Sequence, residues 1–353
     1  MAGVRVAVIG AGWYAAENHI PVLASRPDVA LDGVCRLGAA ELERVRSHFG
    51  FAFASEDHRD VLARRPDAAI VASPHHLHYA HARDAIEAGC HVLCEKPMTL
   101  DPAEAWDLVA RARARGRHLL VANGYHYLRE LARLRALLGT AVGPVEHVAA
   151  NFVSATRNVF EGKAGLGRWQ TSFFRPDAAT WQDPKQGGGF AYGQLSHSIA
   201  LTLWLTGLSP TSVSAAMVPC DVDLFDAATV AFDGGAIGTF SGAAGMPEGQ
   251  RALLTLHIVG RDGAVELALH RDFAAIQRHD GKEIRLDLAP GDWVYRCDGP
   301  VHALIDLAQG RGENLSPGAV GAATVDVIEA IHRSARLGGA PAAIAAPALA
   351  RAP

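Results

Sequence analysis

The sequence feature that most constrains the fold is a β-branched run near the N-terminus that ends at two closely spaced glycines. Residues 4–9 read VRVAVI, a pattern typical of a buried parallel strand. Gly10 and Gly12 follow, and Ala15 completes a G-x-G-x-x-G/A pattern. In this motif the first glycine allows a tight turn, the second lets the backbone approach a pyrophosphate, and the third small residue lets the next helix pack on the strand.

A glycine-rich turn without a ligand is the alternative interpretation. The position of the motif, after a predicted strand and before a helical stretch, favours dinucleotide binding. Phosphates would then lie against N–H groups at the start of the helix, where the partial positive charge favours anions. We expect the cofactor to contact Gly10, Ala11, Gly12, Trp13 and Tyr14.

Length and charge exclude several classes of protein. The 353 residues suffice for two domains, and the net charge of −4 argues against a nucleic-acid partner. No apolar run is long enough to span a bilayer, and the N-terminal strand does not resemble a signal peptide. The five cysteines are scattered and odd in number, which fits neither a disulfide framework nor a zinc site and favours a cytoplasmic protein.

The order of predicted elements indicates two domains. Strands and helices alternate up to about residue 125, as in βαβ units, so we expect a Rossmann domain with a doubly wound parallel sheet over residues 1–125. Residues 126–340 should form an α+β domain with an open, mainly antiparallel sheet, because β segments with hairpin turns fill 211–288. An Ala/Pro-rich tail follows over 341–353, and the long aperiodic stretch 154–189 predicts a functional or mobile loop.

Arg36 follows the second predicted strand, where such folds bind the adenosine ribose. An acidic residue there would bind the ribose hydroxyls of NAD, whereas arginine offers a planar fork to a 2′-phosphate. A hydrogen bond to a charged group contributes about 1.5–3 kcal/mol, or roughly a ten- to hundredfold preference. NADP is therefore the preferred cofactor and NAD the second choice, unless Arg36 stacks on adenine with either nucleotide.

Two residues are the candidates for catalysis. Lys96, in Glu95-Lys96-Pro97, lies at the carboxyl end of a predicted strand, where its ammonium can stabilise an alkoxide; the alternative is an ordinary solvated lysine. His197 lies on a predicted helix that follows three successive glycines at 187–189. Its neutral imidazole can accept a hydroxyl proton, or it is a hydrogen-bonded helix histidine with no catalytic role.

Several polar and aromatic residues allow more than one role. The histidines at 75, 76, 78 and 81 lack an acidic or thiolate partner, so we expect no metal site. We expect Ser73, Pro74, His75 and His78 to line the cofactor cleft together with Glu95, or the histidines to be solvated. The aromatic residues of the long loop can stack on a sugar ring, cover the sheet or form a subunit contact; they are Trp169, Phe173 and Trp181.

Taken together, these stretches resemble the glucose–fructose oxidoreductase / inositol dehydrogenase / MocA (Gfo/Idh/MocA) family over most of the chain. The resemblance rests on the glycine motif, on ASPHHLH over residues 72–78, on EAGCHVLCEKP over 87–97, and on the glycines at 187–189 followed by His197. The second and third motifs together are specific. The resemblance implies NAD(P)-dependent oxidation or reduction of sugars, cyclitols and related polyols, catalytic roles for Lys96 and His197, and a cis Lys96–Pro97 peptide.

The sequence departs from the family pattern at Gly193. Relatives commonly carry Asp-x-x-x-His on this helix, which places both side chains on one face, but here glycine occupies the first position. Another group then replaces the substrate anchor, or the glycine makes room for a larger substrate such as a glycoside. The nearby candidates for contact with the substrate are His126, Asp183, Tyr192 and Gln194. Arg36 is a second departure, because many relatives have an acidic residue there.

Three functions follow as hypotheses. The first is an oxidoreductase that transfers a hydride between nicotinamide and a secondary alcohol or ketone of a sugar, glycoside or cyclitol. The second is a glycosidase or lyase that uses tightly bound NAD transiently, and the third is a non-catalytic dinucleotide sensor. We expect a small polyol or sugar as the substrate, no nucleic-acid or membrane partner, and a homodimer or homotetramer if one sheet face stays uncovered.

Overall fold

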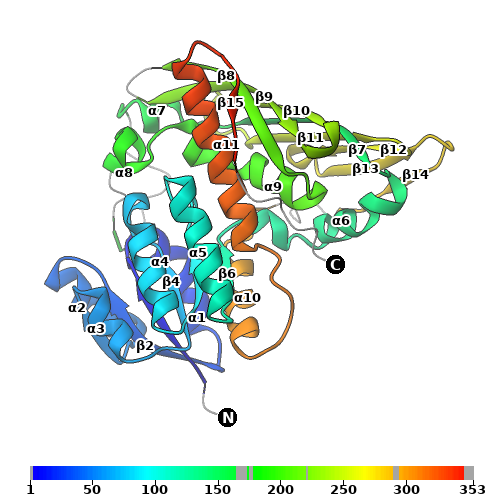
Figure 1. Cartoon of the computed structure of the whole chain (residues 1–353). Coiled ribbons are helices and arrows are strands. Elements are labelled where there is room, and N and C mark those ends of the chain that lie inside the picture. Colours follow the sequence, from blue (N-terminus) through cyan, green and yellow to red (C-terminus); the bar gives the residue numbers. More distant parts are fainter. Residues whose placement is uncertain (1–2, 164–172, 175–177, 220–221, 289–293, 346–353) are drawn as a thin grey trace. The chain divides into compact units, whose positions relative to one another are not determined.

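The computed structural model describes residues 3–163, 173–174, 178–219, 222–288 and 294–345, which form two compact units (Figure 1). Unit 1 comprises Met1–Gly124, Leu166–Thr180 and Arg296–Ala322. Unit 2 comprises Tyr125–Gly165, Trp181–Tyr295 and Ala323–Pro353. The two later returns of the chain to unit 1 differ from the uninterrupted ranges that the sequence suggested.

Unit 1 contains the predicted parallel sheet. Its six strands lie in the order β3-β2-β1-β4-β5-β6, which is a doubly wound arrangement. The apolar residues of β1 are buried because helices cover both faces of the sheet. The strands are β1 (Val4–Ile9), β2 (Val29–Cys35), β3 (Phe53–Ser55), β4 (Ala68–Val71), β5 (His91–Cys94) and β6 (Leu119–Val121).

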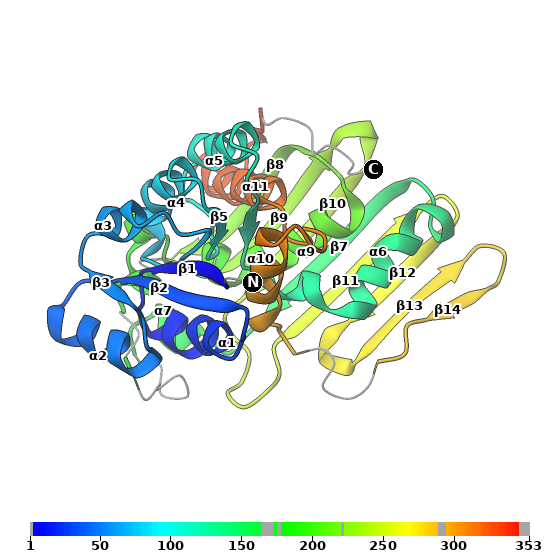
Figure 2. The ribbon, with the colours of Figure 1, turned by 90° about the horizontal axis from the view of Figure 1, so that it is seen from below.

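The helices of unit 1 lie on both sides of this sheet. Figure 2 shows α1 and α2 on one side of the strands and α3, α4 and α5 on the other. Asp101 caps the start of α5, because its side chain accepts the N–H groups of residues 103 and 104 ahead of a proline at the first helical position. The helices are η1 (Ala15–His19), α1 (Ile20–Ala24), α2 (Ala39–Phe49), α3 (His58–Ala63), η2 (His75–Leu77), α4 (His78–Glu87), α5 (Pro102–Ala114) and α10 (Asp298–Ala308).

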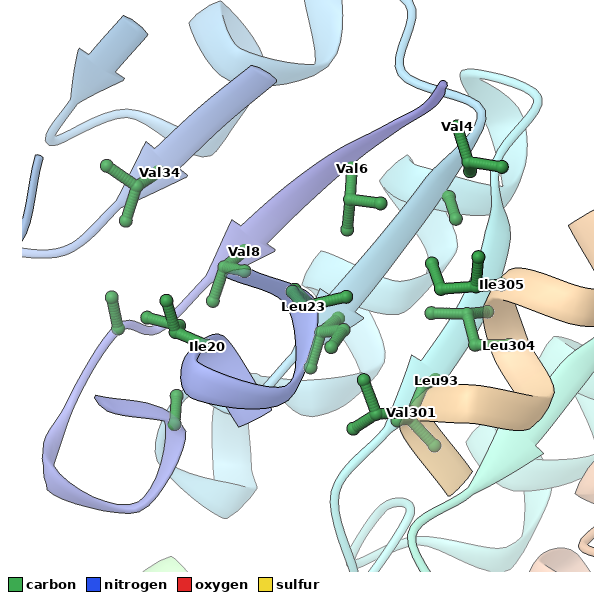
Figure 3. Close-up of a cluster of buried hydrophobic side chains, with 14 of the residues drawn as sticks. Val4, Val6, Val8, Ile20, Leu23, Val34, Leu93, Val301, Leu304 and Ile305 are labelled. Carbon is green, nitrogen blue, oxygen red and sulfur yellow. The ribbon is translucent and has the colours of Figure 1, made fainter. Parts of the chain in front are cut away.

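Helix α10 explains why a distant segment belongs to unit 1. Val301, Leu304 and Ile305 are fully buried and pack in the same cluster as Val6 and Leu93 of the sheet (Figure 3). Apolar side chains three and four residues apart form one face of a helix, so α10 covers sheet surface that would otherwise be exposed to water.

Unit 2 contains a mixed, mainly antiparallel sheet, which confirms the predicted fold class. Its strand order is β14-β13-β12-β11-β7-β10-β9-β8-β15, and β7 pairs with β10 in parallel whereas the other pairs are antiparallel. The strands are β7 (Val145–Val153), β8 (Pro210–Pro219), β9 (Asp223–Phe232), β10 (Ile237–Ala243), β11 (Leu253–Gly260), β12 (Gly263–Ala268), β13 (Phe273–Arg278), β14 (Glu283–Arg285) and β15 (Ala342–Ala343).

Helices α6 and α9 lie over one face of this sheet (Figure 2). The long aperiodic stretch contains short helices in its described part rather than loop alone. The remaining elements are η3 (Gly124–Tyr127), α6 (Arg129–Ala141), α7 (Arg157–Phe160), α8 (Ala179–Gln182), η5 (Pro184–Gln186), η6 (Ala191–Leu195), α9 (Ser196–Thr206), η7 (Asp233–Gly235), η8 (Leu269–Arg271) and α11 (Gly318–Arg336). Among the described residues, no helix combines the length and apolar character needed to cross a bilayer.

The buried position of α10 can be tested with a matched pair of leucine substitutions. Leu304→Ala removes a fully buried side chain and should lower the unfolding free energy by about 2–5 kcal/mol. Leu337→Ala removes the same atoms from a residue that is 60% exposed, so it should change stability by less than about 0.5 kcal/mol. Urea unfolding measures both values. Equal effects would show that α10 does not contribute to the core of unit 1.

Candidate functional site

The glycine turn after β1 is fixed between the ends of two neighbouring strands. Gly10 has a left-handed backbone (φ +86), and a Cβ there would lie 2.2 Å from the backbone nitrogen of Ser73, just beyond β4. The N–H groups of Gly10 and Ala11 both donate to the carbonyl of Cys35 at the end of β2, at 2.9 and 3.1 Å. Only glycine fits the first position of this turn.

Gly12 is the open part of the same turn. The nearest atom to a Cβ built there is the carbonyl oxygen of Gly10, at 3.9 Å. Trp13 and Tyr14 then begin the helix. Accessible backbone at the start of a helix is the environment that a pyrophosphate requires, so the turn fits a dinucleotide. The predicted cofactor residues of this stretch therefore lie together.

The helix after the turn includes η1, a π-helical segment of the kind found frequently at functional sites. Within it His19 is only 1% exposed, and its Nε2 lies 2.7 Å from Oε1 of Glu95. The other carboxylate oxygen of Glu95 accepts the N–H of Lys96 at 3.1 Å. Glu95 thus connects this helix to the backbone of Lys96. No local pattern pointed to His19, because its partner is 76 residues away.

Lys96 follows β5 directly, and the Lys96–Pro97 peptide is cis, as the resemblance implied. Burial lowers the pKa of Lys96 to about 8, while the charges of Glu95 and Cys297 act in the opposite direction. The hydroxyl oxygen of Tyr14 is 3.4 Å from Sγ of Cys297. An amine with this pKa can exist in either protonation state near neutral pH. Cys297 was not predicted, because an isolated cysteine before a helix carries no functional signal.

His78 connects two loops at the same edge of the sheet. It is fully buried, and its ring nitrogens lie 2.8 Å from the carbonyl oxygen of Pro97 and 2.7 Å from that of Ser73. Burial lowers the pKa of its imidazole. A neutral imidazole has one N–H, so His78 donates to one of these two carbonyls and lies between the Ser73 loop and the Lys96–Pro97 peptide. His75 is also buried, with its ring 5.6 Å from that of His78.

The other histidines of this cluster have separate partners. His81 lies 2.9 Å from the hydroxyl of Ser73, and burial lowers its pKa to about 4. His76 is exposed. Among the described residues, no three histidine, cysteine or acidic side chains come close enough to hold a metal ion.

Arg36 is already engaged by the protein. Its Nη1 donates to the carbonyl of Ala11 at 3.3 Å and its Nε to that of Leu37 at 3.1 Å. The ring of Phe174 covers its guanidinium at 3.8 Å from the ring centroid. Burial lowers the pKa of Arg36, whereas the charge of Glu41 raises it. Part of the fork that a 2′-phosphate would use is therefore occupied.

Phe174 and its neighbour show where part of the long loop lies. Phe173 packs on Phe49 and His48 of α2, with centroid distances of 5.4 and 4.7 Å. Phe173 thus contacts the nucleotide-binding unit, which was not among the roles expected for it. Trp169 lies outside the described residues.

In unit 2, His197 is surrounded by aromatic rings. Phe152 stacks on it at a centroid distance of 5.7 Å, while Tyr125 and Tyr295 approach edge-on at 5.8 and 5.0 Å. His197 itself is partly exposed. The π-helical segment η6 lies immediately before it and leads into α9. Aromatic rings around a partly exposed imidazole can stack on the C–H face of a cyclic substrate and restrict the orientation of the imidazole.

Gly193 does not leave empty space in place of the family carboxylate. A Cβ at this position would lie 3.0 Å from Cζ of Phe160 and 3.7 Å from Cζ3 of Trp181. The helix therefore presents an apolar, aromatic surface here. Trp181 was predicted to stack on a sugar, to cover the sheet or to form a subunit contact; its ring instead lies next to Gly193 and Phe160.

The four proposed substrate contacts have different environments. Asp183 caps the short helix η5, accepting from the N–H of Lys185 at 2.9 Å. His126 is 1% exposed and stacks on Trp204 at 4.6 Å. Tyr192 is buried with its ring against His332. Gln194 is partly exposed.

The chain matches two models of one protein family. The model described as an oxidoreductase family with an NAD-binding Rossmann fold matches residues 4–123, and that of the GFO/IDH/MocA C-terminal domain matches residues 135–266. The D-glucoside 3-dehydrogenase of Escherichia coli (strain K12) is 35% identical over 125 residues, which span 35% of either chain.

Solved structures share the fold over nearly the whole chain. An oxidoreductase domain protein from Kribbella flavida has a TM-score of 0.80 at 22% identity, covering 98% of this chain and 100% of that one. A levoglucosan dehydrogenase in complex with NADH and levoglucosan has a TM-score of 0.75 at 18% identity, with coverages of 98% and 100%.

Because aromatic rings lie beside Gly193, we expect that an aspartate at this position destabilises the protein. Gly193→Asp should lower the unfolding free energy by about 2 kcal/mol more than Gly193→Ala, because a carboxylate would be buried against Phe160. Phe160→Ala in the aspartate background should recover part of this difference. Denaturant unfolding of the variants measures the coupling. An aspartate variant as stable as the alanine variant would contradict the prediction.

Proposed function

Since the chain belongs to the Gfo/Idh/MocA family of oxidoreductases with an NAD-binding Rossmann fold, we propose that it transfers a hydride between nicotinamide and a secondary alcohol or ketone of a sugar, glycoside or cyclitol. The observation that carries the proposal is the environment of Lys96. Its amine, with a pKa of about 8, shares one neighbourhood with Tyr14, Glu95 and Cys297, and Tyr14 belongs to the helix that follows the glycine turn.

Each proposed catalytic residue has a distinct task. The ammonium of Lys96 stabilises the negative charge that develops on the substrate oxygen, while Glu95 holds the Lys96 backbone. His197 accepts the hydroxyl proton through its neutral imidazole, and its aromatic neighbours limit the orientations of the ring. The nicotinamide supplies the site that gains or loses the hydride.

Cyclic sugars are the favoured substrates. The relatives named above act on D-glucosides or bind levoglucosan, both of which are pyranose derivatives. The rings around His197 and beside Gly193 are suited to the C–H face of such a ring. Gln194 is the substrate-side candidate that we retain, since Asp183, His126 and Tyr192 have structural partners.

NADP is the proposed preferred nucleotide and NAD the second choice. The positive charge of Arg36, which follows β2, favours binding of the 2′-phosphate of NADP. Its hydrogen bonds to the carbonyls of Ala11 and Leu37 and the nearby charge of Glu41 weaken that support. We therefore expect the protein to prefer NADP over NAD by about tenfold, which is the lower end of the range that a hydrogen bond to a charged group provides.

A cytoplasmic homodimer or homotetramer is part of the proposal. The large apolar residues Val218, Ile237 and Val259, on strands β8, β10 and β11, are exposed. Exposed apolar side chains on one sheet are consistent with a contact between copies of this chain.

The function is tested by a screen of sugars, glycosides and cyclitols with each nucleotide, followed by the absorbance of the reduced cofactor. Nucleotide reduction in step with substrate oxidation is the expected result. Glycosidic cleavage without net nucleotide reduction would indicate transient cofactor use, and nucleotide binding with no turnover on any substrate would indicate a sensor.

Replacements of Lys96 test its role. Lys96→Ala should lower kcat by about a hundredfold or more while leaving the nucleotide Kd little changed. Because the pKa of Lys96 is about 8, its ammonium form is lost as pH rises through that value, so wild-type kcat for oxidation should decrease above pH 8. Lys96→Arg stays charged and should not show this decrease in its remaining activity. Normal turnover by the alanine variant would refute the assignment.

Arg36→Ala distinguishes the two interpretations of this residue. If the guanidinium binds the 2′-phosphate, the affinity for NADPH should fall about tenfold and that for NADH less than twofold. Fluorescence titration with each reduced nucleotide measures both values. An equal loss for the two nucleotides would instead indicate stacking on adenine.

A further inference from the structure

An acidic residue interrupts the apolar pattern of β9. Along this strand Leu224, Ala228 and Val230 are buried in alternation, as expected for a sheet with one covered face. Asp226 occupies the same face and is only 3% exposed. A carboxylate is costly at such a position unless it is neutralised or paired.

The group that acts on Asp226 is another carboxyl group, that of Asp223. Neither oxygen of Asp226 receives an N–H or hydroxyl donor from the described residues, and its hydrogen-bond partner is the side chain of Asp223. Asp223 is itself only 5% exposed. Two carboxylates can only accept hydrogen bonds, so their contact is favourable only when one proton lies between them.

No cation among the described residues compensates this pair. Met217 of β8 and Gly242 of β10 are the register partners of Asp226. His332 of α11 acts on Asp223, but burial lowers the pKa of His332, and its ring stacks on Tyr192 at 5.3 Å. Arg336 and Glu329 act on His332 with opposite signs. Burial and the charge of Asp223 accordingly raise the pKa of Asp226 to about 9.

Asp223 holds the start of the helix that carries His197. One of its carboxylate oxygens accepts the N–H of Ala191 at 2.6 Å. The other lies so close to Gly189 that a Cβ there would be 2.0 Å away, and Gly189 has φ +104. A negative charge is stabilised at a helix N-terminus. These contacts fix the Asp223 carboxyl group against the first turn of this helix.

We propose that Asp223 and Asp226 share a single proton and act together as the positioning pair of His197. Asp223 fixes the first turn of the segment η6–α9, and the O–H of Asp226 keeps the Asp223 carboxylate in place. The link to catalysis rests on the role proposed above for His197, whereas the shared proton does not.

The shared proton makes stability depend on pH in a defined direction. The folded chain keeps a proton on Asp226 between about pH 4 and pH 9, whereas the unfolded chain releases it near pH 4. Stability contributed by this residue is therefore complete below pH 4 and is lost progressively up to about pH 9. Asp226→Asn cannot ionise, yet its amide still offers an N–H to Asp223.

The first experiment compares melting temperatures between pH 5 and pH 8.5. The melting temperature of Asp226→Asn should rise relative to that of wild type as pH increases. The difference between the two should be about 5 °C larger at pH 8.5 than at pH 5. The control is Asp287→Asn, at an exposed residue, which should show no such trend. The same pH dependence in wild type and in Asp226→Asn would overturn the shared proton, whether or not the protein oxidises any sugar.

The second experiment measures kcat and KM at a saturating nucleotide concentration. Asp223→Ala should lower kcat about tenfold with the nucleotide Kd unchanged, because the helix start is displaced while unit 1 is intact. Asp223→Asn should recover much of kcat, since its amide oxygen still accepts from Ala191. An unchanged kcat in Asp223→Ala would overturn the positioning role. An unchanged kcat in His197→Ala would instead overturn the proposed function. If Asp223→Ala does not fold, the Asp223→Asn and Asp226→Asn measurements still decide.

Discussion

The close approach of Gly10 to the backbone of Ser73 is the constraint on which the organisation of unit 1 depends. It joins the ends of the two central strands, β1 and β4, and it leaves no room for a side chain at the first glycine. From Ser73 the connection continues through His78 to the carbonyl of Pro97, and so to the peptide that carries Lys96. The nucleotide turn and the candidate catalytic lysine are therefore connected by one short series of contacts through the His78 ring.

Polar groups buried at this edge destabilise the fold unless they are paired. Nε2 of His19 pairs with one oxygen of Glu95 at 2.7 Å, and the other oxygen of Glu95 accepts the N–H of Lys96. Burial also lowers the pKa of the Lys96 amine to about 8. Perturbed groups of this kind are frequent at functional sites, where the altered protonation equilibrium is useful.

In unit 2, the residues around His197 differ from the pattern that is common in the family. Where the family commonly places a carboxylate four residues before His197, this chain has a glycine covered by Phe160 and Trp181. Acidic groups occur instead beneath the start of the helix, where Asp223 binds the N–H of Ala191. In this chain a carboxylate therefore contacts the start of the helix, while aromatic rings lie beside Gly193.

The sequence alone determined the features that depend on local conformation. The strand and glycine turn at residues 4–15, the Asp101 cap of α5 and the alternation of β9 each follow from the backbone or side-chain preferences of a few adjacent residues. The parallel and mainly antiparallel sheets followed from the order of these elements. The same reasoning selected Lys96 and His197 as candidates, since each follows a recognisable local pattern.

Only the tertiary structure decided which distant groups meet. Glu95 pairs with His19 across 76 residues, Phe174 covers Arg36, and Tyr14 contacts Cys297 across 283 residues. The return of α10 to unit 1 was likewise not encoded in any local pattern. Contacts of this kind depend on which apolar faces must be covered and which buried charges need a partner. Both requirements arise only once the sheets have formed and water has been excluded.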